Sequence, residues 1–319
     1  PDLPRLRLVQ VGTAALDSLM LPLIALLLAR AGMGWRAALL GAACYLLPIP
    51  ALEALSIGEL ANIAGQSIAM AFVALLILGA LRTDARWGLV VLAGATLAVG
   101  LLAHSGVTLS LGAFTAAAWL LTLVRALRAR RTQLTEPTPV DLARLSLIAG
   151  AALSLVLLIY YSAPVYVENI LGRVHSSNEP TGGHSSIVTI LAQTLTGILG
   201  LTPTGIHAMP PLLGGLAIAG LGMLWARRSV QPAAAGLRLG LAALWLSVLM
   251  TQTLLLVSEQ GVRWPLFLTP ALCLSAGPLL AALLNRGRAG RLAASAALAA
   301  TLTYGLLIWV LQIRDYFHI

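Results

Sequence analysis

Polar side chains at helical spacing follow the second apolar stretch of the chain. In residues 48–66 (PIPALEALSIGELANIAGQ), Glu59, Asn62 and Gln66 succeed one another at intervals of three and four. Such intervals place the three side chains on one face of a helix. Ser56 and Glu59 also match a capping box, which explains these two residues by helix initiation alone. Asn62 and Gln66 lie one and two turns deeper, so we expect this face to bind a polar ligand, with Glu59 as a candidate general base.

An arginine in residues 258–270 (SEQGVRWPLFLTP) is the main candidate for binding an anion. Arg263 follows Glu259 and precedes Trp264 at the start of an apolar stretch. Its planar guanidinium offers a fork of donors that matches phosphate oxygens. The alternative interpretation is an Arg–Trp anchor at the level of the lipid headgroups, which needs no ligand.

Two further segments carry polar residues beside apolar stretches. His104 lies in LLAHSGVTLSL, where a single histidine is more often structural than catalytic. Tyr161 belongs to IYYSAPVYVENILGRVHSSNEPTGGH, whose tyrosines also fit an aromatic belt at a membrane surface. His175 and His184 lack a recognised metal-ligand spacing, so no metal site is predicted. The sequence contains no P-loop, GxSxG, HExxH or CxxC motif.

The composition shows what surrounds these residues. The 319 residues are 59% hydrophobic and 10% charged, and their mean hydropathy is +0.92. A soluble domain carries about 25% charged residues, so this chain belongs to the membrane class. Its net charge of +9 comes from arginines in short clusters between apolar stretches. This pattern is typical of membrane proteins and does not indicate binding to nucleic acid.

Ten segments are long and apolar enough to cross a bilayer, which needs about 20 residues per helix. They cover residues 8–29, 37–55, 64–81, 86–103, 106–124, 145–163, 209–226, 237–257, 265–284 and 292–312. An eleventh apolar stretch, 187–201, is short and predicts a re-entrant or interfacial helix. We therefore expect an all-α, polytopic membrane protein with about ten transmembrane helices plus this short helix.

The arginines indicate the orientation. If the connections near 30–36, 82–86, 125–144, 227–238 and 285–291 are cytoplasmic, fifteen of the twenty arginines lie inside, as the positive-inside rule requires. Residues 164–208 then form an extracytoplasmic loop, and 187–201 should not cross. All five histidines and most of the acids fall on or near the outer side, so we expect an extracytoplasmic functional face at a cell membrane. Arg263 is also outside, on the side disfavoured for basic residues, which supports its role as an anion contact.

The chain reads as a single transmembrane helical domain, 1–319. Pro137 and Pro139 interrupt the cytoplasmic linker 125–144. This linker joins two expected sub-bundles, 1–124 and 145–319, between which we find no convincing internal repeat.

Three segments resemble glycosyltransferases of the GT-C class, which use lipid-linked sugars, and in particular bacterial mannosyl- and arabinosyltransferases. They are IGELANIAGQ (57–66), LLAHSG (101–106), and VRWPLFLTPALCLSAG (262–277) with the basic turn NRGRAGR (285–291). The resemblance implies a polyprenyl-phosphate sugar as donor. It also implies that Arg263 is similar to the residue that grips the polyprenyl phosphate.

The acidic residue of that class is the point of departure. In GT-C proteins, an acid in the first extracytoplasmic loop acts as the base or as the metal contact, so a divalent cation is a candidate cofactor. No such acidic motif precedes residue 53 here. Three explanations stay open: the N-terminal part of such a protein is missing, Glu53 or Glu59 takes the role, or the chain is a degenerate relative without activity.

The resulting hypothesis is transfer of a sugar from a polyprenyl-phosphate donor to an extracytoplasmic acceptor. Glu59 or Glu53 would deprotonate the acceptor hydroxyl, and Arg263 would stabilise the departing phosphate. The expected substrate-binding residues are Arg263, His104, Asn62, Gln66, Glu259 and Tyr161. The sequence specifies neither the sugar, the acceptor nor the oligomeric state.

Two other classes of function compete with this hypothesis. A transporter or flippase of lipid-linked anions would carry polar residues deep in its spans and inverted repeats, and only Asp17 is so placed. A non-catalytic structural subunit of a membrane complex needs no active site. Convergence of Glu59, His104 and Arg263 in one cavity would separate the enzyme from both.

Overall fold

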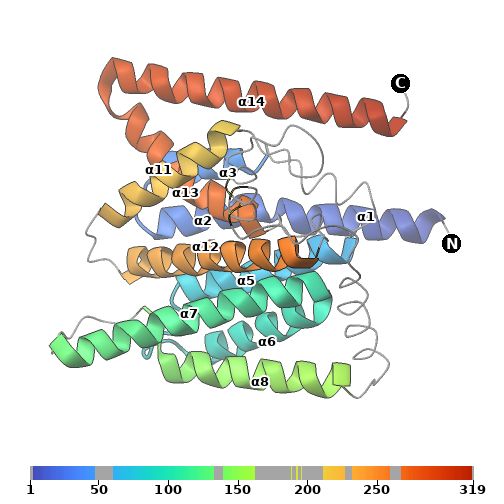
Figure 1. Cartoon of the computed structure of the whole chain (residues 1–319), viewed down its shortest axis with the longest axis vertical. Helices are drawn as coiled ribbons and strands as arrows, with labels where there is room; N and C mark the ends of the chain where they lie inside the picture. The colour runs from blue at the N-terminus through green and yellow to red at the C-terminus, as the bar shows by residue number, and fades with distance from the viewer. Residues whose placement is uncertain are drawn as a thin grey trace.

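The computed structural model of the chain describes residues 3–46, 60–132, 139–161, 211–226, 232–258 and 267–317, plus the single positions Val188, Ala192 and Leu195. These residues contain α-helices and no strands, which confirms the predicted all-α fold. Figure 1 shows most of the helices lying along a common direction. The helices described are α1 (Leu3–Ser18), α2 (Met20–Arg30), α3 (Trp35–Cys44), α5 (Leu60–Ile77), α6 (Trp87–Ala103), α7 (Ser105–Thr132), α8 (Leu142–Tyr161), α11 (Pro211–Ala226), α12 (Pro232–Ser258), α13 (Leu268–Leu284) and α14 (Gly287–Phe317).

A bend at Leu19 separates α1 from α2 within the first apolar stretch. Pro22 has no N–H to donate to the carbonyl of Ser18, and its ring crowds that carbonyl. Leu19 N instead donates to Leu16 O at 3.1 Å, which closes the end of α1. The interruption is brief, and Arg7–Arg30 remains a single apolar stretch of 24 residues.

Five helical stretches are long and apolar enough to cross a membrane, in the part of the chain that the structure describes. They are Arg7–Arg30, Leu60–Ile77, Gly106–Ala129, Leu142–Tyr160 and Pro232–Thr251. Three further apolar helices are shorter: Trp87–Ala103, Leu212–Ala226 and Leu268–Leu284. These helices are those of a membrane protein, with five qualifying spans where the sequence led us to expect ten. The difference arises partly from helix length, because α6, α11 and α13 have 17, 16 and 17 residues.

The expected short helix at 187–201 falls almost entirely outside the described residues. Val188, Ala192 and Leu195 are the described positions within it, and each is helical. The rest of the extracytoplasmic loop predicted at 164–208 also lies outside the described ranges.

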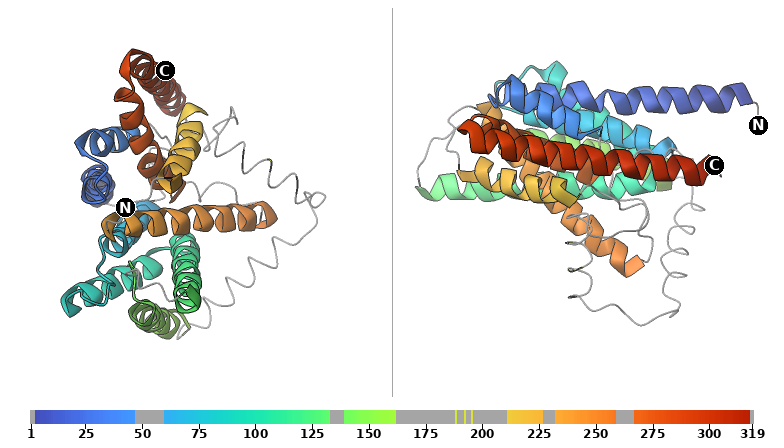
Figure 2. Two further views of the ribbon diagram at one scale, coloured as in Figure 1. Left: turned by 90° about the vertical axis from the view of Figure 1, so that its left-hand side faces the viewer. Right: turned by 90° about the horizontal axis from the view of Figure 1, so that it is seen from above.

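The helices pack in two groups. One contains α2, α3, α11, α13 and α14, with α13 against α3 and α11. The other contains α5, α6, α7, α8 and α12, with α12 against α7 and α5 against α6. Contacts of α12 with α13 and of α2 with α5 join the two groups through the middle of the bundle (Figure 2, left). Each group draws helices from both sides of residues 125–144.

The linker expected at 125–144 is partly helical. α7 continues to Thr132 before the described residues break off. Ala, Leu and Arg in 125–131 (RALRARR) are good helix formers, and the first proline comes only at Pro137. The helix end predicted from hydropathy therefore comes too early, because a helix can extend beyond the apolar core of the membrane into water.

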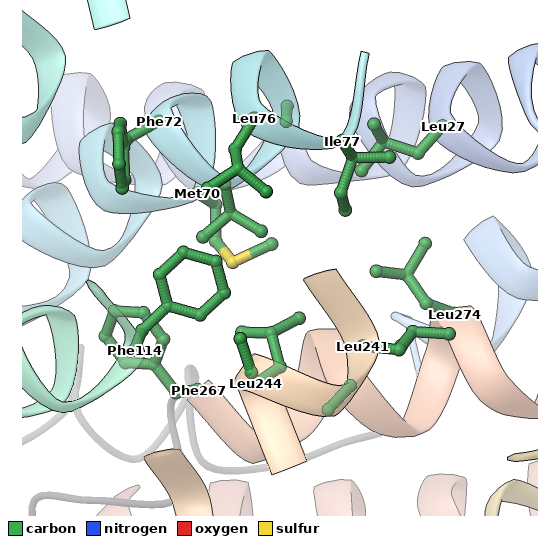
Figure 3. Packing of buried hydrophobic residues seen from close by; sticks show 14 of the residues in the cluster. Leu27, Met70, Phe72, Leu76, Ile77, Phe114, Leu241, Leu244, Phe267 and Leu274 are labelled. Atoms are coloured by element: carbon green, nitrogen blue, oxygen red, sulfur yellow. The ribbon is translucent and has the colours of Figure 1, made fainter. Parts of the chain in front are cut away.

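Aromatic and aliphatic side chains fill the centre of the bundle. Phe72 of α5 and Phe114 of α7 are fully buried, and their rings meet edge to face with centroids 6.1 Å apart. Figure 3 shows Met70 and Leu244 beside this pair. Lipid tails are as apolar as these side chains, so close fit and dispersion hold the helices together more than exclusion of water does.

Glycines let α13 approach the backbones of its neighbours. A Cβ at Gly277 would lie 2.7 Å from the carbonyl oxygen of Ala37 and 2.8 Å from Gly41 Cα, both on α3. A Cβ at Gly220 of α11 would overlap the carbonyl oxygen of Ser275. Small residues at these crossings allow the close helix packing that is typical of membrane proteins.

The arginine-bearing connections at 30–36, 82–86, 139–144 and 285–291 gather at one end of the bundle, which we call the basic end. Arg36 Nη1 donates to Asn285 Oδ1 at 2.7 Å, although 249 residues separate the two. Asp141 N donates to Leu81 O at 2.8 Å, which joins the start of α8 to the connection that follows α5. Hydrogen bonds therefore link these connections in pairs.

Candidate functional site

The candidate site lies at the opposite end of the bundle from the basic end. There the N-terminal turns of α5 and α7 meet the C-terminal turns of α6 and α8. We call Asn62, Gln66, His104 and Gly106 the polar cluster. Asn62 and Gln66 belong to α5, His104 joins α6 to α7, and Gly106 lies in the first turn of α7.

His104 is the residue that caps α7. Its backbone is extended, with φ −164° and ψ 145°, so the chain turns sharply between the two helices. Gly106 N donates to His104 Nδ1 at 3.1 Å, and Thr108 N donates to His104 O at 2.8 Å. The imidazole thus takes the place of the usual capping oxygen. Because Nδ1 accepts a hydrogen bond, the neutral ring carries its proton on Nε2.

Thr108 fixes the same junction from the other side. Its Oγ1 donates to Leu101 O at 2.6 Å and to His104 O at 3.0 Å. These bonds satisfy carbonyls that the end of α6 would otherwise leave open. The position of His104 is consequently set by the protein itself, before any ligand binds.

Asn62 borders the start of α7. A Cβ at Gly106 would lie 3.2 Å from Asn62 Oδ1 and 3.4 Å from His104 Nδ1. The amide and the imidazole therefore flank the same glycine. Asn62 is only 1% exposed, although it is polar and close to a helix end.

Gln66 lies one turn deeper on α5 and is also 1% exposed. Gly65 explains this burial, because a Cβ there would lie 2.8 Å from Ala103 Cβ and 3.0 Å from Val107 Cγ2. α5 thus presses its backbone against the α6–α7 junction. Burying amides costs free energy unless they are hydrogen-bonded, so two of them on one face mark it as specialised.

Tyr160 ties α8 to the same end. Its Oη donates to Leu102 O at 2.6 Å, in the last turn of α6. The sequence pattern explains this tyrosine by an aromatic belt, whereas the structure gives it a defined interhelical bond. Its neighbour Tyr161 ends α8, and the structure describes only its backbone.

The structure brings together three of the predicted site residues: Asn62, Gln66 and His104. Glu53, Glu59, Glu259 and Arg263 fall outside the described residues, so the predicted base and the predicted anion contact are not placed. Gly106 was missed by sequence reasoning, because a glycine in an apolar helix carries no distinguishing signal.

The side chains of the polar cluster that can form hydrogen bonds are two amides and one imidazole, all neutral donor and acceptor groups. The partial positive charge at the N-terminus of α7 adds to them. Such a set of groups is better suited to binding hydroxyl groups and ring oxygens than to binding a ligand with an isolated full charge. The described ranges hold no group of three or more His, Cys, Asp or Glu residues that could bind a metal ion.

A second polar contact lies in the interior of the bundle. Tyr45, at the end of α3, donates from its hydroxyl to Asp17 Oδ1 at 2.6 Å. Asp17 stands out in the sequence as a carboxylate inside the first span. Tyr45 does not, because a tyrosine within an apolar run is usually a packing residue.

Comparison with known proteins gives no relative: no family model, no curated protein and no solved structure matches this chain.

Proposed function

We propose that the chain is a multi-span membrane glycosyltransferase that moves a sugar from a polyprenyl-phosphate donor to an acceptor on the extracytoplasmic side. The observation that carries this proposal is the convergence of Asn62 and His104 on Gly106. A buried amide and a fixed imidazole at one helix junction are suited to orienting sugar hydroxyls.

The geometry of His104 limits its role in this proposal. Nδ1 accepts from Gly106 N, so the ring offers its Nε2 proton as a hydrogen-bond donor. His104 therefore binds and orients the substrate, and the general base is Glu59 or Glu53. Arg263 holds the departing phosphate, and Glu259 and Tyr161 complete the set of substrate-binding residues.

The membrane arrangement belongs to the same proposal. The segments that contain α3, α6, α11, α13 and α14 cross the bilayer beside the five stretches named above, which gives ten crossings, and 187–201 stays on the outer side. The bond between Arg36 and Asn285 supports this count, because it joins two connections that the arginine bias assigns to the cytoplasm. The bond from Asp141 N to Leu81 O supports it in the same way for two others.

Labelling of single cysteines tests the arrangement. The native Cys44 and Cys273 are 1% and 0% exposed, so the unaltered chain should give little background. In sealed cells, a membrane-impermeant maleimide should label Arg7→Cys. Arg86→Cys and Arg288→Cys should react only after the membrane is opened. Labelling of Arg288→Cys from outside would contradict the count of crossings between Arg86 and Arg288.

An assay of sugar transfer tests the activity. The purified chain in liposomes is given a polyprenyl-phosphate sugar with a radioactive label, and released or transferred sugar is measured. We expect Asn62→Leu to lower the rate at least tenfold, because a buried amide that meets a hydroxyl cannot be replaced by an apolar group. Thr122→Val is the matched control, since Thr122 is equally buried but bonds to Ala118 O in its own helix.

Loss of transfer in Arg263→Ala would support the assignment of the phosphate contact. Unchanged transfer in both Arg263→Ala and Asn62→Leu would show that the site is wrong. If the unaltered chain releases no sugar but moves the lipid-linked donor between leaflets, it is a flippase. If it does neither, the chain is a structural subunit.

A further inference from the structure

Asp17 is a carboxyl group near the middle of the first spanning stretch. Arg7–Arg30 is 24 residues long, and Asp17 comes ten residues after its start and thirteen before its end. At a rise of about 1.5 Å per residue, the carboxyl lies roughly 15 Å from one end and 20 Å from the other. Placing an ionisable residue at this depth costs free energy, and such residues in membrane proteins usually have a function.

Tyr45 is the group that meets this carboxyl. Its hydroxyl donates to Asp17 Oδ1 at 2.6 Å, and its side chain is 8% exposed. The bond connects α1 to the end of α3, which come from separate spans. A tyrosine hydroxyl is uncharged, so it orients the carboxyl without neutralising a negative charge.

The surroundings of Asp17 supply no cation within the described residues. α1 packs on α5 and α2; α5 carries no charged residue, and the arginine of α2 is at its far end, Arg30. Arg36 of α3 is likewise at the far end and bonds to Asn285. Among the described residues, the thiol of Cys273 interacts electrostatically with Tyr45, and the thiol of Cys44 interacts with Cys273.

We propose that Asp17 and Tyr45 form a proton-binding site inside the membrane, a function beyond the glycosyltransferase activity. Asp17 holds the proton on Oδ2, while its Oδ1 accepts the hydrogen of the tyrosine hydroxyl. A neutral carboxylic acid removes the cost of an uncompensated charge in hydrocarbon. Loss of this proton places one negative charge between α1 and α3, and its gain removes that charge.

Infrared spectroscopy of the full chain in phosphatidylcholine vesicles tests the site. At neutral pH, the carbonyl stretch of a protonated carboxylic acid should be present in the unaltered chain and absent in Asp17→Asn. It should persist in Asp84→Asn, the matched control, because Asp84 is exposed and ion-paired with Arg82. In Tyr45→Phe the band should remain but move to higher frequency, since the carbonyl loses its hydrogen bond. This second variant assigns the band even if Asp17→Asn fails to fold.

Exchange with water is tested in the same samples. Replacing H₂O by D₂O should shift the band, and raising the pH should remove it, whereas added sodium or potassium chloride at constant pH should leave it unchanged. Absence of the band at neutral pH, or its persistence in Asp17→Asn, would overturn the proposal. Removal of the band by sodium alone would also overturn it, because the site would then hold a metal cation in place of the proton.

Discussion

The guanidinium of Arg144 lies over the ring of Trp87, with Cζ 5.1 Å from the ring centroid. The same guanidinium donates to the carbonyl oxygens of Arg82, of Thr83 at 2.7 Å and of Ala85 at 2.9 Å. One side chain at the start of α8 thus organises the whole connection between α5 and α6. It does so through several N–H donors held in fixed directions, and not through its positive charge alone.

Arg144→Lys should therefore destabilise the chain although the charge is retained. A lysine ammonium cannot bond to three carbonyls while stacking on an indole. We expect a loss of about 1–3 kcal/mol, measured as a lower midpoint of thermal unfolding in detergent. Arg86→Lys is the control, because Arg86 is exposed on the same connection. This substitution should leave the stability of the chain unchanged. Equal losses of stability in the two variants would mean that, at the basic end, only the charge of these arginines contributes to stability.

Two glycines of α11 should respond to alanine in opposite ways. At Gly220 an added Cβ would overlap the carbonyl oxygen of Ser275, whereas at Gly222 it would meet nothing within 4 Å. Gly220→Ala should cost about 1–3 kcal/mol or more through forced separation of α11 and α13. Gly222→Ala should stabilise slightly, by up to about 1 kcal/mol, through helix propensity. Unfolding of both variants in the same detergent compares them, and a neutral Gly220→Ala would contradict the close crossing.

Two variants of His104 distinguish its role in helix capping from its role in substrate binding. His104→Asn should keep the stability of the chain, because Asn is a good N-cap and can accept from Gly106 N. His104→Ala should lose about 1 kcal/mol with the cap. If His104 orients the sugar, both variants should lose transfer activity to a similar extent. Full activity in His104→Asn would assign the residue to the helix junction alone.

Gly106→Ala should affect binding more than folding. The new methyl group would lie 3.2 Å from Asn62 Oδ1 and 3.4 Å from His104 Nδ1, so it would crowd both. We expect a raised KM for the lipid-linked sugar with a modest change in unfolding temperature. Gly112→Ala, where nothing lies within 4 Å, is the control on the same helix. Equal KM values in the two variants would remove Gly106 from the site.

The Arg82–Asp84 pair gives the basic end a small dependence on pH. The hydrogen bond from Arg82 is the main cause that lowers the pKa of Asp84 below its ordinary value of 3.8. A lowered pKa in the folded chain means that the contribution is complete above the unfolded pKa and is lost as the pH falls through the folded one. The unfolding temperatures of the unaltered chain and Asp84→Asn should thus differ at neutral pH and converge in strong acid. The gap should be small because Asp84 is exposed, and a gap that widens in acid would contradict the sign.

The sequence predicted the all-α fold because a run of apolar residues near 20 has few structural alternatives. It did not predict where helices end, as α7 shows by continuing to Thr132. Nor did it predict which helices pair. In lipid, an apolar face does not select its partner, and pairing depends on small residues such as Gly41 and Gly277, whose effect appears only when two backbones meet.

The candidate site was predictable in part for a related reason. Asn62 and Gln66 interrupt an apolar helix at one spacing, and His104 lies at a span end on the same side, so their convergence follows from topology. The capping of α7 by His104 Nδ1 does not follow from topology, since it depends on an extended φ of −164° at a single residue. The bond between Tyr45 and Asp17 likewise requires a particular rotation of α3 against α1.

The crossing of α3 and α13 also has a consequence for biosynthesis. Gly41 and Gly277 meet backbone to backbone, yet Gly277 is made 236 residues after Gly41. At a translation rate of about 5–20 residues per second, α3 waits on the order of tens of seconds for its partner. During that interval its glycine face has only lipid, the translocation machinery or a chaperone to contact. A ribosome that stalls before residue 268 would release a chain whose first spans are inserted but unfinished, which is a substrate for membrane quality control.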